Sequence, residues 1–262
     1  MEITREEALR ELHRRISGRK FFKYEPYRWQ SQFHREGLDS QERMLRAANR
    51  VGKTYSAAYE AACHATLAYP DWWQGKRFTH STLGWVVSHT NETSRDIVQK
   101  ELLGSDVGTG LIPADSISKI TYRQAGVSNV VDTVKIRCPH GLSTISFRTF
   151  DQGWRKFQGA APEFIWLDEE PEDFRIYTEC LTRVLTSKGI IFVTFTPLLG
   201  ETDLVRHFEK GVTGTSVQTA TWDDAPHLSE EIKERFIESF PLHERDARTK
   251  GVPMMGEGRV FP

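Results

Sequence analysis

The chain has 262 residues, of which 38% are hydrophobic and 27% are charged, a composition typical of a soluble globular protein that excludes fibrous and disordered classes. Its 35 Lys and Arg residues against 36 Asp and Glu residues give a net charge of -1, which excludes a protein that coats nucleic acid through bulk charge but allows a local basic track. No apolar run approaches about 18 residues and the N-terminus alternates in charge, so we expect neither a membrane span nor a signal peptide.

The three cysteines, Cys63, Cys138 and Cys180, are odd in number and lack the spacing of metal ligands. This usage is typical of a reducing cytoplasm, and we expect buried free thiols. Cys138 and His140 are too close together and too isolated for a metal site, so the segment between them is predicted to be a turn.

The N-terminal segment predicts an amphipathic helix that ends near Gly18. Thr4 and Glu7 stand in the spacing of a capping box, and apolar residues recur behind them at helical intervals. We expect this helix to be an arm packed on the core. The basic residues from Arg14 to Arg28 form either a solvated face or a contact for phosphates or an acidic neighbouring subunit.

The segment from Tyr24 to Phe33 combines aromatic and amide side chains ahead of a phosphate-binding motif. In helicase-like P-loop enzymes, a glutamine at this distance hydrogen-bonds the adenine edge, because an amide both donates and accepts. Gln30, which follows Trp29, is our candidate in preference to Gln32. The alternative is an amide on a helix surface.

The segment from Leu45 to Thr54 predicts a Walker A loop, with an apolar lead-in, a short turn and Gly-Lys-Thr opening a helix. Backbone N–H groups would surround the phosphates, the Lys53 ammonium would reach the β and γ oxygens, and the Thr54 hydroxyl would bind Mg²⁺. The first position of the motif, usually Gly, holds Ala47. The predicted nucleotide-binding residues of the loop are Ala47, Asn49, Arg50, Val51, Gly52, Lys53 and Thr54.

Alternating helical and strand signals follow the loop. A helix running to about Tyr69 carries a stripe of alanines that would let it lie close on a sheet. The adjacent Trp72 and Trp73 favour packing over a base-stacking platform. We also predict a buried strand at Gly84–Ser88 and a helix capped by Asn91 that ends near Leu103.

The middle of the chain predicts an extended loop and then two strands. Polar residues and glycines gather between Gly104 and Gly126, which indicates the loop. Residues Val130–Arg137 and Ser143–Phe150 alternate across a turn, the pattern of paired strands.

The run Phe164 to Glu170 is a short apolar strand that ends in carboxylates, as in a Walker B element. Asp168 would hold Mg²⁺, and Glu169 would polarise the attacking water as general base. The strand from Gly189 ends similarly in hydroxyls and a proline. Thr194 and Thr196 are therefore candidates to sense the γ-phosphate, the alternative being a simple strand end.

These motifs, taken together, resemble the ATPase domain of the large terminase subunit of tailed double-stranded-DNA bacteriophages. The resemblance rests on Trp29-Gln30, the Ala-led loop, Asp151 to Gly159 ahead of Leu-Asp-Glu-Glu-Pro, and Thr194-Phe195-Thr196-Pro197. It implies an α/β fold of the ASCE P-loop type, with a mostly parallel sheet flanked by helices and a small helical lid. It also implies ATP and Mg²⁺ as cofactors, and translocation of double-stranded DNA into a procapsid.

Further properties follow from the same resemblance. A homo-oligomeric ring would work in the host cell cytoplasm, docked on the procapsid, with the portal and the small terminase subunit as partners. An arginine would reach a neighbour's ATP, a role that falls to Arg155, with Arg148 as second choice. Arg50 would be a cis sensor, a second arginine finger, or a phosphate-positioning charge.

The resemblance also suggests a division of the chain into residues 1–212, an ATPase core with its N-terminal arm, and residues 213–262, a lid and linker. The boundary lies near Gly211 to Gly214, and helical stretches follow at Glu230–Ser239 and Leu242–Lys250. The family usually continues into an RNase H-like nuclease, so we expect the end of this chain to lead toward a domain it lacks. Two rival functions are a helicase-like DNA-dependent ATPase and a non-hydrolysing assembly module that holds nucleotide as a clamp.

Overall fold

The computed structural model describes residues 20–124 and 126–254, so the predicted N-terminal arm lies outside the described residues. An eight-stranded sheet with the order β3-β4-β5-β2-β6-β7-β1-β8 forms the centre of the fold. Strands β1, β2, β5, β6, β7 and β8 pair in parallel, whereas β3, β4 and β5 pair antiparallel. The predicted mostly parallel α/β fold is confirmed.

The strands are β1 (Glu42–Ala47), β2 (Leu83–Ser88), β3 (Ile117–Tyr122), β4 (Val131–Cys138), β5 (Gly141–Thr149), β6 (Phe164–Asp168), β7 (Ile190–Phe195) and β8 (Thr215–Ala220). The α-helices are α2 (Arg28–Glu36), α3 (Lys53–Thr66), α4 (Asn91–Thr93), α5 (Lys100–Leu103), α6 (Phe174–Ser187), α7 (Asp203–Glu209), α8 (Glu230–Ser239) and α9 (Arg245–Lys250). The shorter elements are the π-helical η1 (Ser94–Gln99) and the 3₁₀ turns η2 (Ala114–Ser116), η3 (Phe150–Gln152), η4 (Trp154–Phe157), η5 (Trp222–Asp224) and η6 (Leu242–Glu244).

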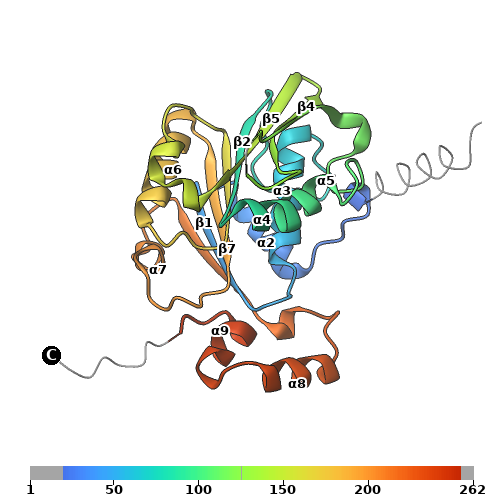
Figure 1. Cartoon of the computed structure of the whole chain (residues 1–262). Helices are drawn as coiled ribbons and strands as arrows, with labels where there is room; N and C mark the ends of the chain where they lie inside the picture. The colour runs from blue at the N-terminus through green and yellow to red at the C-terminus, as the bar shows by residue number, and fades with distance from the viewer. Residues whose placement is uncertain (1–19, 125, 255–262) are drawn as a thin grey trace, which may run out of the picture.

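Helices cover the two faces of the sheet unequally. Helices α2, α3, α4 and α5 lie on one side and α6 on the other, while α8 and α9 form a separate layer at one end (Figure 1). The alanine stripe of α3 (Ala58, Ala61, Ala62 and Ala65) is fully buried, as predicted. Trp73 is buried and Trp72 packs against the same core, which favours the packing role for this pair.

A buried charge cluster fastens α2 and α3 to β1. Arg43 is fully buried, forms an ion pair with Glu60 and donates to the Phe33 carbonyl at 2.7 Å. Glu60 also accepts from His34 Nδ1 at 2.7 Å and contacts His64 Nε2 at 3.3 Å. Arg43 and both histidine contacts hold the pKa of Glu60 well below its usual range against the opposing effect of burial. Burial lowers the pKa of both histidines.

Local predictions in the middle of the chain were partly wrong. The helix that ends at Leu103 is capped by Thr90, whose hydroxyl accepts from Thr93 N, and Asn91 is its first residue. The stretch predicted as an extended loop, Gly104 to Gly126, contains the edge strand β3. Its side chains are mostly exposed, so β3 lacks the apolar alternation that identifies a half-buried strand.

The predicted boundary at Gly211 to Gly214 precedes β8, which pairs in parallel with β1. The sheet therefore continues to Ala220. Helix α8 spans the predicted Glu230–Ser239, and the second predicted stretch comprises η6 and α9. No helix in the described part of the chain is long and apolar enough to cross a membrane.

The cysteine predictions are confirmed in part. Cys63, Cys138 and Cys180 are free, but only Cys63 and Cys180 are buried, because Cys138 stands beside the turn that joins β4 to β5. The residues between Cys138 and Gly141 form the predicted turn. Within the described ranges, no group of three or more His, Cys, Asp and Glu side chains could hold a metal ion.

Candidate nucleotide-binding site

The loop between β1 and α3 has the backbone shape of a phosphate-binding turn. Gly52 is the N-cap of α3 and adopts a left-handed conformation, with φ of 98°, so the first N–H groups of a 14-residue helix point into the loop. Arg50 also has a positive φ of 62°, which is uncommon for a residue with a Cβ atom. Ala47 ends β1 with a negative φ, so the position that is usually glycine needs no glycine here.

The two predicted motifs meet at the carboxyl edge of the parallel strands. Thr54 Oγ1 donates to Asp168 Oδ1 at 3.3 Å, although the residues are far apart in sequence. Lys53 Nζ lies 3.8 Å from Glu169 Oε1. The strand order explains the meeting, since β6 and β1 both lie beside β7 and point the same way.

Asp168 is a buried carboxyl group in a site rich in charge. Burial raises its pKa first and the neighbouring Glu169 raises it further, to about 7, while Lys53 and the hydroxyls of Thr194 and Thr54 act in the opposite direction. Glu169 is partly exposed and has a φ of 77°, a left-handed conformation held by its N–H, which donates to the Thr194 carbonyl at 2.9 Å. Such strained positions occur often in active sites.

The two threonines predicted at the end of β7 have different surroundings. Thr194 is fully buried; its hydroxyl donates to Asp168 Oδ1 at 3.1 Å and accepts from Trp166 Nε1 at 2.9 Å. Thr196 accepts from Lys53 Nζ at 3.0 Å. Its hydroxyl also lies 3.0 Å from the Ala47 carbonyl and 2.8 Å from Asn49 Oδ1. Thr194 therefore orients a carboxylate, and Thr196 connects β7 to the loop.

Gln30 borders the loop from α2 and is 3% exposed. Its Oε1 accepts from the Tyr27 N–H at 2.8 Å, and its Nε2 donates to the Gly52 carbonyl at 3.4 Å. Gln32 instead contacts Glu36 on the surface. A cavity of about 410 Å³ opens beside Gln30, lined by Lys23, Tyr24, Glu25, Tyr27, Gln30, Gly52, Tyr55 and His227.

The C-terminal helical layer holds the centre of the loop, a contact that the sequence motifs did not predict. Trp222 Nε1 donates to the Asn49 carbonyl and His227 Nε2 contacts the Arg50 carbonyl, both at 2.9 Å. The Asn49 N–H donates to the Arg248 carbonyl at 2.8 Å. The Arg50 guanidinium lies 5.3 Å from the centre of the Phe236 ring on α8 and is turned toward the helical layer.

The two candidate finger arginines differ in exposure. Arg155 lies in η4, is exposed and stacks on the Trp154 ring at 5.0 Å. Arg148 is half-buried, lies 4.0 Å from the centre of the Trp85 ring and donates to the Lys156 carbonyl. Burial lowers the pKa of Arg148. Within the described residues, the structure brings neither arginine to the loop of its own chain.

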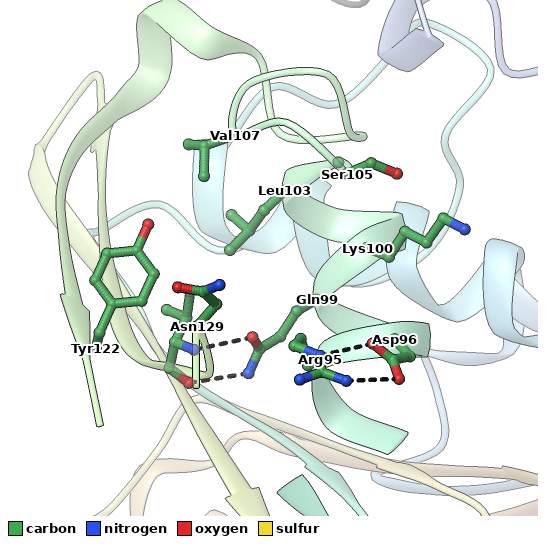
Figure 2. Close-up of a pocket in the computed structure, with 11 residues that line it drawn as sticks. Arg95, Asp96, Gln99, Lys100, Leu103, Ser105, Val107, Tyr122 and Asn129 are labelled. Atoms are coloured by element: carbon green, nitrogen blue, oxygen red, sulfur yellow. Dashed lines mark hydrogen bonds and ion pairs between the residues drawn. The ribbon is translucent and has the colours of Figure 1, made fainter. Parts of the chain in front are cut away.

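A second cavity, of about 520 Å³, lies away from the loop, between η1–α5 and the β3–β4 connection (Figure 2). Gln99 closes it from inside, since its amide donates to the Val131 carbonyl and accepts from the Val131 N–H. Arg95 on its rim is paired with Asp96. Gln99 and Arg95 thus already have partners at this cavity, whereas the turn with phosphate-binding geometry lies between β1 and α3.

Comparisons with known proteins show the family to which the chain belongs. Residues 44–262 match the family model described as terminase large subunit, T4likevirus-type, N-terminal. The large terminase subunit of Salmonella phage P22 is 35% identical over 265 residues, an alignment that covers 92% of this chain and 52% of that protein. The chain therefore spans about half the length of this curated relative.

Solved structures share the fold at low identity. The large terminase ATPase domain of Thermus phage P74-26 superposes with a TM-score of 0.66 at 15% identity, covering 97% of this chain and 100% of that one. The large terminase of the thermophilic bacteriophage D6E in complex with ADP gives a TM-score of 0.60 at 13% identity, covering 93% of this chain and 52% of that one. The chain therefore belongs to the large terminase subunit family of phages and corresponds to the N-terminal part of that subunit.

Proposed function

We propose that this chain is the motor domain that hydrolyses ATP in a phage DNA-packaging terminase. The observation that carries the proposal is the convergence of Lys53, Thr54, Asp168, Glu169 and Thr196 at one edge of the sheet. ATP hydrolysis needs a phosphate cradle, a cation site and a base within reach of each other. The D6E relative was solved with ADP and with ATP-gamma-S, and the P74-26 relative is described as an ATPase domain.

The phosphates of ATP would bind at the N-terminus of α3. The N–H groups of the loop residues from Asn49 to Thr54, together with the positive end of the helix, would hold the β- and γ-phosphates. Lys53 Nζ now lies between the Thr196 hydroxyl and Glu169, so it would move a short way toward the phosphate oxygens. Gln30, with its remaining amide donor and acceptor, would face the adenine in the adjoining cavity.

The site also fits Mg²⁺. Thr54 and Asp168 provide the hard oxygen ligands that this ion prefers, and both oxygens already lie 3.3 Å apart. The pKa of Asp168 is raised by burial and by Glu169, so a cation would relieve the cost of holding two carboxylates together. Bound Mg²⁺ would neutralise charge on the phosphates. Thr194 would keep Asp168 in the orientation that this role needs.

Glu169 would act as the general base that orients and polarises the attacking water. It follows the metal-ligating aspartate directly, and its left-handed backbone turns its carboxylate toward Lys53 rather than into the sheet. Arg155 would complete the site of a neighbouring subunit, because it is exposed and lies away from the loop of its own chain. Arg50 faces α8, so it would transmit changes in the loop conformation to the helical layer rather than contact the phosphate.

Loss of the γ-phosphate would reach the C-terminal helices by two routes. One route is the contact of Thr196 with the loop. The other is the hydrogen bonding of Trp222 to the Asn49 carbonyl and of His227 to the Arg50 carbonyl. We take the lid to begin after β8, at Thr221. In the complete particle, a ring of such subunits would dock with the portal and small subunit on a procapsid in the host cytoplasm and pull double-stranded DNA inward.

Substitution of Lys53 by Ala tests the assignment. The variant should lose ATP hydrolysis and bind ATP weakly, and a Lys210→Ala variant, altered at an exposed lysine outside the site, should retain both. Full ATPase activity in Lys53→Ala would contradict the proposal. Hydrolysis that is accompanied by strand separation, in an assay with a forked duplex, would favour the helicase alternative. Tight ATP binding without phosphate release from the parent chain would favour the nucleotide clamp.

A further inference from the structure

One face of the antiparallel corner of the sheet carries cations and hydroxyls. The register places Lys119 of β3 opposite Lys135 of β4, and Lys135 opposite Thr144 of β5. The next row on the same face is Thr121, Thr133 and Ser146. Arg137 lies two residues beyond Lys135 and therefore points to this face as well. We call these seven residues the β3–β5 basic face.

The basic face is open to solvent. Lys119, Lys135, Arg137 and Thr121 are exposed, while the intervening Val134 and Ile136 are buried on the opposite face against α3. Helix α6, on the side of the basic face, instead packs on β6 and β7 (Figure 1). Among the described residues, α3 therefore covers one side of the sheet corner, and the basic face on the other side is exposed.

The two lysines of the basic face stand as a like-charge pair. Like charges directly opposite each other on neighbouring strands destabilise a sheet. Within the described residues, no carboxylate lies within 4.0 Å of Lys119 or Lys135, and Asp132, on the same strand, faces Arg123 at 3.7 Å. Arg137 is fixed by hydrogen bonds to the Asp115 and Ile117 carbonyls at 3.1 and 3.0 Å. The fold therefore holds three cations together on one face without an acidic counterpart for the two lysines.

We propose that the β3–β5 basic face binds the phosphodiester backbone of double-stranded DNA. The face offers Lys, Arg, Ser and Thr, the side chains that make most contacts to phosphate oxygens. It carries no aromatic platform for unstacked bases, and its strands offer a surface rather than a deep pocket, which suits contact with a duplex backbone without sequence readout. An anionic backbone would also relieve the repulsion between the two lysines. The inference rests on the proposed packaging function and adds to it the surface that touches DNA.

The position of the basic face is consistent with a role in the motor cycle. Strand β5 runs directly into η3 and η4, which carry the exposed Arg155 and Lys156. Strand β5 also pairs with β2, which in turn pairs with β6, the strand that delivers Asp168. DNA bound on this face would therefore be two strands away from the strand that carries the proposed catalytic carboxylates.

The test is DNA binding over a salt series. A labelled blunt duplex of random sequence is titrated with the 262-residue chain, and with the variant Lys119→Ala/Lys135→Ala, by fluorescence anisotropy. The association constant of the variant should fall, and the slope of its logarithm against the logarithm of salt concentration should shrink in magnitude by about 2, one for each phosphate that the variant no longer neutralises. ATP binding, measured in parallel, should be unchanged, because neither lysine lies at the loop.

The matched control is Arg206→Ala/Lys210→Ala, which removes two cations near α7 at the opposite edge of the sheet. It should leave the DNA slope as in the parent chain. Equal DNA binding by the parent chain and by Lys119→Ala/Lys135→Ala would overturn the inference but not the motor proposal. The same holds if the variant no longer self-associates yet still binds DNA, because the face would then be a subunit interface. A parent chain that hydrolyses ATP but binds no DNA in any nucleotide state would overturn both.

Discussion

Two regions of the sheet use polar residues in opposite ways. At the edge formed by β1, β6 and β7, every polar group of the site contacts another: Lys53 contacts Thr196, and Asp168 contacts both Thr54 and Thr194. At the β3–β5 corner, Lys119 and Lys135 face each other, and none of the described carboxylates lies within 4.0 Å of either ammonium group. The first region is thus a site preorganised by its own contacts, and the second is a surface whose charges we propose are neutralised by a bound partner.

The largest effect is expected at the arginine proposed to act between subunits. Arg155→Ala should lower ATP turnover in the assembled state by about 10³- to 10⁵-fold, because the arginine would stabilise charge on the transferred phosphoryl group. Steady-state phosphate release as a function of protein concentration measures it, and the deficit should vanish in the dilute, unassembled chain. Arg148→Ala is the comparison, since Arg148 packs on Trp85 and should change stability more than turnover. The reverse outcome, with Arg148 controlling turnover, would reassign the finger.

The next effect concerns the buried charge cluster under the loop. Glu60→Gln should cost about 3–5 kcal/mol of unfolding free energy near neutral pH, because it leaves the charge of the buried Arg43 without its partner. Chemical denaturation measures the change. Glu163→Gln, at a half-buried carboxylate in another part of the sheet, is the control. A loss of unfolding free energy below about 1 kcal/mol, the scale of an exposed ion pair, would mean that the cluster does not stabilise the packing of α2 and α3 on β1.

The same cluster predicts how stability depends on pH. Burial lowers the pKa of His34 and His64, so the unfolded chain binds more protons once the pH falls below the ordinary histidine value of about 6.5. The pKa of Glu60 is depressed, so its contribution is fully present above the ordinary glutamate value of about 4.3 and is lost as the pH falls through the lowered folded value. The stability that this cluster contributes should thus decline below about pH 6.5, whereas the pKa values of Asp168 and Glu170, raised to about 7, act in the opposite direction between about pH 7 and pH 4. Chemical denaturation of the parent chain and of a His34→Gln/His64→Gln variant isolates the cluster, and the parent should lose more stability than the variant between about pH 7 and pH 5. An equal pH dependence of the two chains would contradict the lowered histidine pKa values.

The smallest effect comes from the open corner and has the opposite sign. Lys119→Thr should raise the unfolding free energy by about 0.2–1 kcal/mol, because it removes cross-strand repulsion and places a β-branched residue in a strand. Thermal melting at low salt measures the gain, which should shrink as salt screens the charges. A variant that is less stable than the parent would show that Lys119 is held by interactions within the fold. The two regions would then not differ in how their polar groups are satisfied.

Sequence patterns predict the first region and miss the second for a physical reason. The Walker A loop and Leu167-Asp168-Glu169 are local signals, each an apolar strand followed by the residues that the chemistry needs. The strand order then brings them together, as the family resemblance implies. Strand β3 carries little apolar alternation, so its sequence indicates a loop, and the pairing of Lys119 with Lys135 appears only when the register is known.

The contacts of the lid illustrate the same limit. The sequence indicates a lid that includes Thr221 to Leu228, but nothing local says that Trp222 and His227 reach the carbonyls of Asn49 and Arg50. Likewise, Thr194 and Thr196 look equivalent in sequence, and only the fold shows that one contacts Asp168 and the other the loop. Contacts between distant segments depend on how the chain packs, and local residue patterns do not predict that packing.

Glu169 is proposed to activate water on an ATP held by the loop, and substitution of this residue separates ATP binding from hydrolysis. Glu169→Gln keeps the size and the hydrogen-bonding capacity of the side chain but removes its basicity. Binding of MgATP, followed by calorimetry, and single-turnover phosphate release should be measured on the same preparation. We expect ATP affinity close to that of the parent chain together with loss of phosphate release. Phosphate release at the parent rate would contradict the account.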